Sequence, residues 1–132
     1  MCDTVQINGY FITYKKIGRG AKKAVLLHGW GASKSWWLPM AEGLAETHTC
    51  YIPDLLGFWE STKPTKREAF HIEHQANIVA NLIRQFDLEP VYLIGHSMGG
   101  MIGVTLAHHY PDLVDRLAVF NLVVTGRCGS FF

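Results

Sequence analysis

The residues of this 132-residue chain that are most suited to chemistry lie between Val91 and Gly103. The stretch begins as an apolar run, turns over at Gly95-His96-Ser97-Met98-Gly99 and continues as an apolar segment rich in small residues. Its centre has the pattern G-x-S-x-G, which between a strand and a helix holds a serine on a sharp, strained turn. The glycines are needed because the strand and helix backbones pass close together there. The pattern therefore predicts that Ser97 is a nucleophile.

A helix that begins at Met98 would point its free N–H groups, and the positive end of its dipole, at the Ser97 oxygen. The same serine could instead simply cap the helix, with its hydroxyl accepting a hydrogen bond from a backbone N–H. A chain of this length contains G-x-S-x-G by chance in roughly a few per cent of cases, so the motif alone is moderate support. The surrounding sequence favours the nucleophile.

The composition indicates one globular domain. The chain is 48% hydrophobic and 17% charged, with a formal net charge of +1, so neither nucleic acid nor an acidic partner is expected. It has no apolar run of about 18 residues and no basic-then-apolar leader, so we expect no membrane partner. Cys2, Cys50 and Cys128 lack metal or redox spacing and indicate reduced thiols in the cytoplasm. We expect no metal and no cofactor.

The elements that must position Ser97 alternate between strands and helices. A hairpin is predicted where Asn8-Gly9 joins Thr4–Ile7 to Tyr10–Tyr14. A capping box at Thr65–Glu68 is expected to open a long helix, and Pro111 to stop the helix after Ser97. The other expected elements are strands at Ala24–Leu27, Cys50–Ile52 and Leu117–Val124 and a turn plus helix within Ser33–Thr47, with Pro39 in its first turn.

This alternation predicts an α/β fold with a mostly parallel sheet, flanking helices and an antiparallel hairpin at one edge. Ligands of such sheets bind outside the carboxyl ends of the strands. His28-Gly29-Trp30, Asp54-Leu55-Leu56-Gly57 and Ser97 all follow directly on expected strands. Three such segments on one rim of the sheet predict a site there.

Three segments, in this order and at this spacing, resemble the α/β-hydrolase family in its lipase, esterase and C–C hydrolase branch. They are Leu26–Gly31, Ile52–Phe58 and Gly95–Gly100, and the resemblance extends from about residue 9 to residue 122. It implies a serine hydrolase that acts on an ester, thioester, amide or activated carbon–carbon bond of a small acyl substrate. A haloalkane dehalogenase is disfavoured because those enzymes have a carboxylate where Ser97 stands.

The resemblance also implies roles for the residues around Ser97. The backbone N–H groups of Met98 and Trp30 are the expected oxyanion-hole donors, and such a donor is typically worth 10²–10³ in rate. His28 is expected to brace the loop that carries Trp30, and Asp54 to hold the loop after its own strand. The residues expected to support the site structurally are His28, Gly29, Asp54, Gly95, His96 and Gly99.

The sequence departs from the family pattern after Asp54-Leu55-Leu56-Gly57-Phe58. Trp59 stands where the family usually has a second glycine. This puts the tight turn of that loop in question.

A larger departure concerns the acid and the base that a serine nucleophile needs, which in this family follow the serine in that order. After Ser97 the only carboxylates are Asp112 and Asp115, and no histidine follows them. His108 and His109 would lie roughly 16 Å from Ser97 along a helix. The family's alternative acid position, just after the last expected strand, holds Val124, Thr125 and Gly126.

We therefore expect residues 1–132 to form a single incomplete domain, the amino-terminal half of the family fold, with residues 126–132 as an unstructured tail. One hypothesis is a truncated enzyme that has little activity alone. The alternative is a non-catalytic pseudoenzyme, or a fragment that pairs with another chain. The exposed edge of the Leu117–Val124 strand also predicts self-association.

Overall fold

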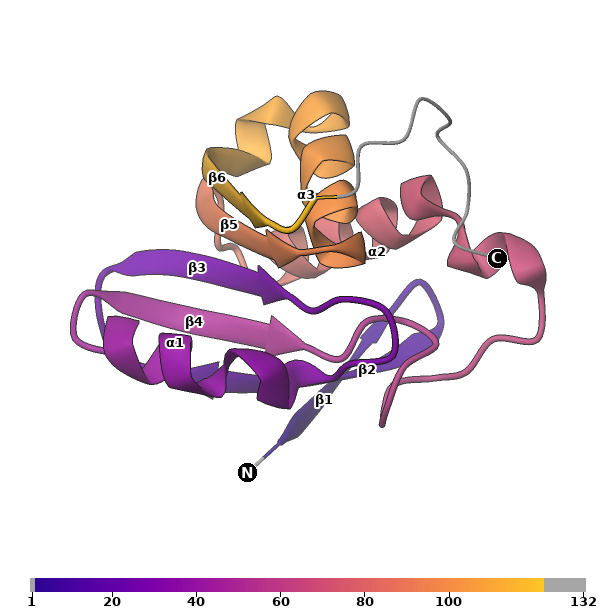
Figure 1. Ribbon diagram of the computed structural model, residues 1–132, viewed down its shortest axis with the longest axis horizontal. Coiled ribbons are helices and arrows are strands. Elements are labelled where there is room, and N and C mark those ends of the chain that lie inside the picture. The colour runs from indigo at the N-terminus through magenta and orange to yellow at the C-terminus, as the bar shows by residue number, and fades with distance from the viewer. Residues whose placement is uncertain (1, 123–132) are drawn as a thin grey trace.

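The computed structural model describes residues 2–122 (Figure 1), and the expected tail at 126–132 lies outside them. The described strands are β1 (Asp3–Ile7), β2 (Tyr10–Ile17), β3 (Lys22–Leu27), β4 (His48–Pro53), β5 (Val91–His96) and β6 (Val114–Phe120). The α-helices are α1 (Leu38–Leu44), α2 (Ile72–Gln85) and α3 (Met98–His109). Short 3-10 helices lie at Lys34–Trp37, Arg67–Phe70 and Pro111–Leu113.

The strands form one sheet in the order β1-β2-β4-β3-β5-β6. β1 and β2 pair antiparallel with each other, β2 pairs antiparallel with β4, and the other pairs are parallel. The predicted α/β class and the hairpin at one edge are confirmed. Asn8 and Gly9 have φ angles of 51° and 83°, the left-handed backbone that a two-residue hairpin turn needs.

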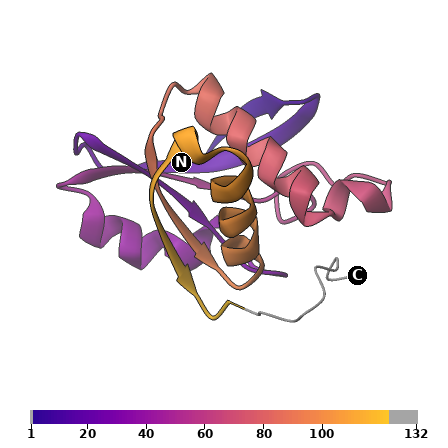
Figure 2. The same ribbon diagram turned by 90° about the horizontal axis from the view of Figure 1, so that it is seen from above.

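Helices cover both faces of the sheet, with α1 on one side and α2 and α3 on the other (Figure 2). β3 shows why its last four residues, Ala24–Leu27, are all apolar. Ala24 and Leu26 pack in the cluster under α1, whereas Val25 and Leu27 pack in the cluster under α2 and α3. A strand buried on both faces has no polar positions, so the run gives no period-2 alternation.

Two expected boundaries are wrong. The capping box at Thr65–Glu68 does not open the long helix, because the chain forms a 3-10 helix at Arg67–Phe70 and α2 begins only at Ile72. The last strand runs over Val114–Phe120 instead of Leu117–Val124, because it starts directly after the 3-10 turn at Pro111–Leu113. The apolar composition of residues 122–124 suggested a later strand than the one that the turn permits.

Trp59 occupies the turn that the sequence put in question, and it is strained there. Its φ angle is 47° and its side chain is 63% exposed, so the indole fills no core volume. We expect Trp59→Gly to raise the free energy of unfolding by about 1 kcal/mol, because a non-glycine residue in this region costs roughly 1–2 kcal/mol and glycine adds some unfolded-state entropy.

Urea titration measures this change. Trp36 is a matched control, since it is 55% exposed but has no left-handed backbone. Trp36→Gly should lower stability, as glycine does in a helical turn. A loss of several kcal/mol in Trp59→Gly would contradict the expectation.

Candidate active site

Ser97 lies on the turn between β5 and α3 in a strained conformation. Its φ and ψ angles are 53° and −115°, and a residue held outside the common regions costs about 1–3 kcal/mol. The turn is held because the Ser97 N–H donates to the Phe120 carbonyl (2.9 Å) and the Ser97 carbonyl accepts from the Met101 N–H (3.1 Å). The Ser97 side chain makes no capping hydrogen bond to α3. The simple helix cap that the sequence left open is therefore not what this serine forms.

The glycines of the motif allow backbones to approach one another closely. A Cβ atom on Gly95 would lie 2.3 Å from the Gly99 carbonyl oxygen. A Cβ atom on Gly99 would lie 2.3 Å from the Leu27 carbonyl oxygen and 2.6 Å from that of His28. The start of α3 is thus pressed against the end of β3, which brings the loop after β3 to Ser97.

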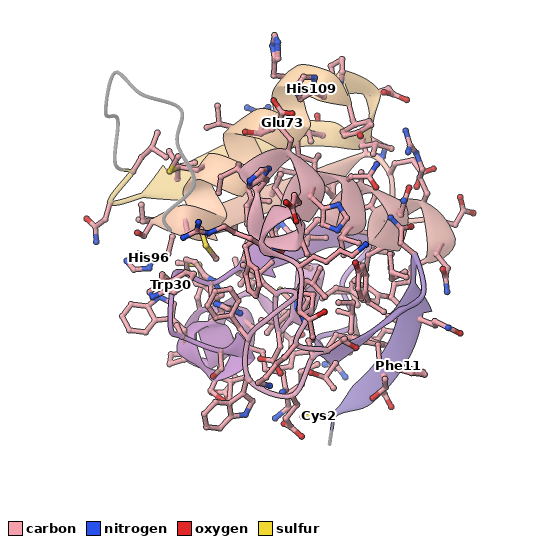
Figure 3. The ribbon with its side chains drawn as sticks, turned by 90° about the vertical axis from the view of Figure 1, so that its right-hand side faces the viewer. Cys2, Phe11, Trp30, Glu73, His96 and His109 are labelled. Atoms are coloured by element: carbon pink, nitrogen blue, oxygen red, sulfur yellow. The ribbon has the colours of Figure 1, made fainter. Side chains whose placement is uncertain are left out.

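Gly29 shows how near that loop comes. A Cβ atom on Gly29 would lie 3.3 Å from Ser97 Cβ and 3.0 Å from His96 Nδ1. Figure 3 shows Trp30, the next residue, at the same edge of the molecule as His96. The structure therefore brings together Ser97, Met98 and the His28-Gly29-Trp30 segment, as the order of the motifs predicts.

His28 links the loop after β3 to the loop after β4. It is fully buried, its Nδ1 lies 2.7 Å from the Gly29 carbonyl oxygen, and its Nε2 accepts the Leu55 N–H at 2.9 Å. The proton must therefore sit on Nδ1. Burial lowers the pKa of His28, which keeps the ring neutral and able to hold both bonds.

Asp54 is the centre of a second, charged connection. Its Oδ1 accepts the backbone N–H of Lys34 (2.8 Å), and its Oδ2 accepts from Lys34 Nζ (2.5 Å) and Thr13 Oγ1 (2.6 Å). Burial alone would raise the pKa of Asp54, but the bonds from Lys34 and Thr13 outweigh it and hold the pKa below its usual value. Lys34 was not predicted as part of the site, because a lone lysine beside serines and tryptophans gives no sequence signal.

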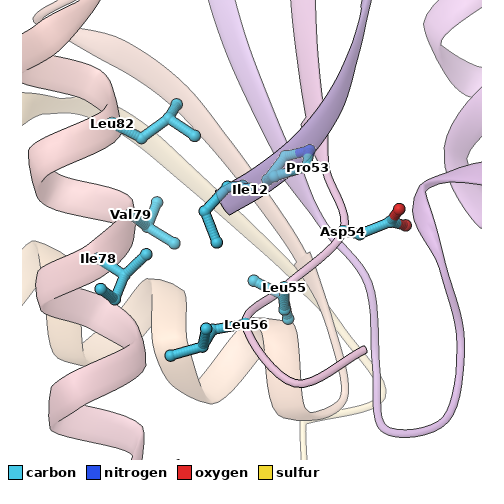
Figure 4. A pocket seen from close by; sticks show the side chains of 8 residues that line it. All are labelled: Ile12, Pro53, Asp54, Leu55, Leu56, Ile78, Val79 and Leu82. Carbon is cyan, nitrogen blue, oxygen red and sulfur yellow. The ribbon is translucent and has the colours of Figure 1, made fainter. Parts of the chain in front are cut away.

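Figure 4 shows Asp54 beside a small cavity, with its carboxylate pointing away from the apolar side chains. The cavity measures about 10 Å³, enough for roughly one water molecule, so it is a packing gap and no substrate site. Its lining consists of Ile12, Pro53, Asp54, Leu55, Leu56, Ile78, Val79 and Leu82.

Aromatic rings surround the serine turn. The ring of Trp36 stacks on His96 with 4.9 Å between centroids, and Trp30 meets Phe58 edge-on at the same distance. Trp37 is buried, whereas Trp30 and Trp36 are about half exposed. His96 thus packs beside Ser97, and among the described residues its Nδ1 has no hydrogen-bond partner.

The two histidines at the end of α3, His108 and His109, lie too far from Ser97 to act as its base. α3 is twelve residues long, so its two ends lie roughly 16 Å apart, and Figure 3 shows His109 far from His96. The first residue after β6 is Asn121, because β6 ends at Phe120. Asn121 carries an amide and not a carboxylate, and the expected acid position at residues 124–126 lies outside the described residues.

Residues 2–122 contain no group of three or more histidine, cysteine, aspartate or glutamate side chains that could hold a metal ion. No helix in that range is both long and apolar enough to cross a membrane.

Comparison with known proteins agrees with this geometry. A sequence model of the alpha/beta hydrolase fold matches residues 25–124. A soluble epoxide hydrolase from Corynebacterium sp. strain C12 is 36% identical over 117 residues, covering 89% of this chain and 40% of that protein. A putative carbamate hydrolase from Serratia proteamaculans is 35% identical over 101 residues, covering 76% of this chain and 38% of that protein.

A solved structure described as a membrane phospholipase A and bacterial virulence factor superposes with a TM-score of 0.89 and 32% identity. That match covers 96% of this chain and 42% of the phospholipase chain. The chain thus spans about two fifths of the length of these relatives. The relatives are hydrolases of different bonds on one common scaffold. The chain therefore belongs to the α/β-hydrolase fold family, as the matched residues, the serine turn and the sheet order show.

Proposed function

We propose that this chain carries the nucleophile and the oxyanion hole of a serine hydrolase that acts on an ester, thioester or activated carbon–carbon bond. The observation that carries the proposal is the strained Ser97, which begins α3 without capping it. Strain of this kind persists only where the surrounding structure enforces it, and it concentrates at active sites. The close approach of Gly29 to Ser97 supports the proposed second half of the hole, because it brings the loop that carries Trp30 near the serine.

In the proposed reaction Ser97 Oγ attacks the substrate carbonyl carbon and gives up its proton to a histidine base. The N–H groups of Met98 and Trp30 stabilise the oxyanion, and the leaving group departs with the proton from the base. Water then attacks the acyl-serine ester and releases the acid and the free Ser97. His108 and His109 lie too far along α3 to serve. The proposal therefore takes the base and its acid from a further part of the polypeptide or from another chain.

The experiment joins residues 1–122 to the carboxyl-terminal part of the Serratia relative, which must supply an acid followed by a histidine. Hydrolysis of p-nitrophenyl acetate is then compared between the fusion and its Ser97→Ala variant. Hydrolysis that depends on Ser97 supports the proposal. Equal rates in both proteins would overturn it.

The alternative function is that of a half that associates with another chain, and β6 favours it. Within residues 2–122 β6 is an edge strand of the sheet, and Leu117, Val119 and Phe120 are each about two fifths exposed. An edge strand with free N–H and C=O groups and apolar side chains is a template for pairing. We therefore propose self-association of the isolated chain through β6.

We expect Ala118→Lys to weaken this association at least about tenfold, because a lysine on an edge strand opposes pairing. Val104→Lys is the control. Val104 is exposed on α3, so this substitution adds the same charge away from the edge strand. Size-exclusion chromatography with light scattering over a concentration series measures both. A monomer at every concentration in the unmodified chain would rule the association out.

Cys2 is exposed and Cys50 is buried, and both are free thiols. An exposed free thiol is typical of a reducing compartment. This supports our proposal that the protein works in the cytoplasm.

A further inference from the structure

The loop that carries Trp30 is tied to the segment after β4 on both sides. On one side His28 accepts the N–H of Leu55, and on the other side Lys34 reaches Asp54. Asp54 and Leu55 are adjacent, so both ties end at one short, buried piece of chain. Trp30 therefore sits in a seven-residue span whose two ends are fixed to the same anchor.

We propose that Lys34 is a positioning residue that fixes the Trp30 loop against the serine turn through its contacts with Asp54. The inference rests on the proposed function in one respect only, which is that the Trp30 N–H serves as an oxyanion donor. The fixing of the loop itself follows from the contacts and can be tested without any catalysis.

Three contacts of Lys34 carry the inference. Its backbone N–H and its Nζ bind the two oxygens of the same carboxylate, at 2.8 Å and 2.5 Å. The Nζ also donates to Glu60 Oε1 at 3.0 Å. A residue bound at both its backbone and its side-chain end has little freedom to move, so the loop that leads into it is fixed as well.

The burial of these groups differs and shows which contact matters. The side chains of Lys34 and Asp54 are 5% and 0% exposed, whereas that of Glu60 is 58% exposed. An exposed ion pair is screened by water and contributes little. A buried charge needs its partner, because losing that partner leaves an uncompensated ion. The connection to Asp54 is therefore the one that holds the loop.

A merely structural ion pair would stabilise the whole domain without acting on the loop in particular. Amide hydrogen exchange separates these two roles. The Ala32 N–H donates to the Gly29 carbonyl and reports on the loop, and the Leu55 N–H donates to His28 and reports on the anchor. Leu93 lies at the centre of β5 and reports on the sheet.

In Lys34→Met we expect exchange at Ala32 and Leu55 to become at least tenfold faster, while exchange at Leu93 changes less than twofold. Glu60→Gln removes only the charge of the exposed partner and should leave all three rates within twofold of the unmodified chain. If Lys34→Met does not fold, the double variant Lys34→Met/Asp54→Asn removes both charges and carries the same expectation.

Equal acceleration at all three amides, or no change at Ala32 and Leu55, would overturn the inference. Because exchange is measured without substrate, this result is independent of the Ser97 test. Selective loosening together with an inactive fusion would keep Lys34 as the residue that fixes the loop and refute the serine-hydrolase proposal. A fusion with Ser97-dependent activity but equal acceleration of exchange at all three amides would support the serine-hydrolase proposal and refute the role of Lys34.

Discussion

Ser97→Ala should lower kcat/KM for p-nitrophenyl acetate by about 10⁴-fold or more in the fusion that supplies the acid and the histidine, since loss of a serine nucleophile removes the covalent route. The 132-residue chain alone should show little hydrolysis. Without a base the Ser97 hydroxyl stays protonated at neutral pH and is a weak nucleophile. Adding the second half should therefore raise the rate, and Ser97→Ala should return it to the background.

The oxyanion hole can be tested in the same fusion through a backbone change. Trp30→Pro removes the backbone N–H and should cost on the order of 10²–10³ in kcat. Trp30→Ala keeps the N–H and removes only the half-exposed indole, so its kcat should fall less than tenfold. Circular dichroism melting checks that both variants fold. Equal losses in the two variants would show that the indole matters and the N–H does not.

Much of the fold could be predicted because each element carries a local signal. The Asn8-Gly9 turn and the long helix before the serine motif, α2, appear as the sequence suggests, although α2 begins later than expected. His28, Asp54 and Ser97 could be placed at one edge of the sheet because each directly follows a strand, and the carboxyl ends of parallel strands lie on the same edge. These features depend on short-range periodicity and turn chemistry, which a single sequence contains.

The missed features depend on contacts between distant residues. Lys34 lies in a run of serines and tryptophans, and only the fold brings its ammonium to Asp54, twenty residues later. The end of β6 at Phe120 is set by pairing with β5, in which Phe120 lies opposite His96. Asn121 follows Phe120, and the apolar Leu122-Val123-Val124 after it suggested that the strand continues. Pairing across the sheet decides such boundaries.

The close contact at the start of α3 predicts that any side chain at Gly99 destabilises the fold. In Gly99→Ala the new Cβ atom would lie 2.3 Å and 2.6 Å from the carbonyl oxygens of Leu27 and His28. Both neighbours are backbone atoms of a buried strand end, so neither can rotate away as a flexible side chain would. We expect the free energy of unfolding to fall by about 3 kcal/mol, at the upper end of overpacking costs, because the α3 and β3 backbones must separate.

Gly43 in α1 is the matched control, because a Cβ atom there meets nothing within 4 Å. Gly43→Ala should raise the free energy of unfolding by about 0.5–1 kcal/mol, as alanine does in a helix. Urea titration of both variants gives the two signs directly. A Gly99→Ala variant as stable as the unmodified chain would mean that α3 does not press against β3. The approach of the Trp30 loop to Ser97 would then lose its support, because that approach depends on the same contact.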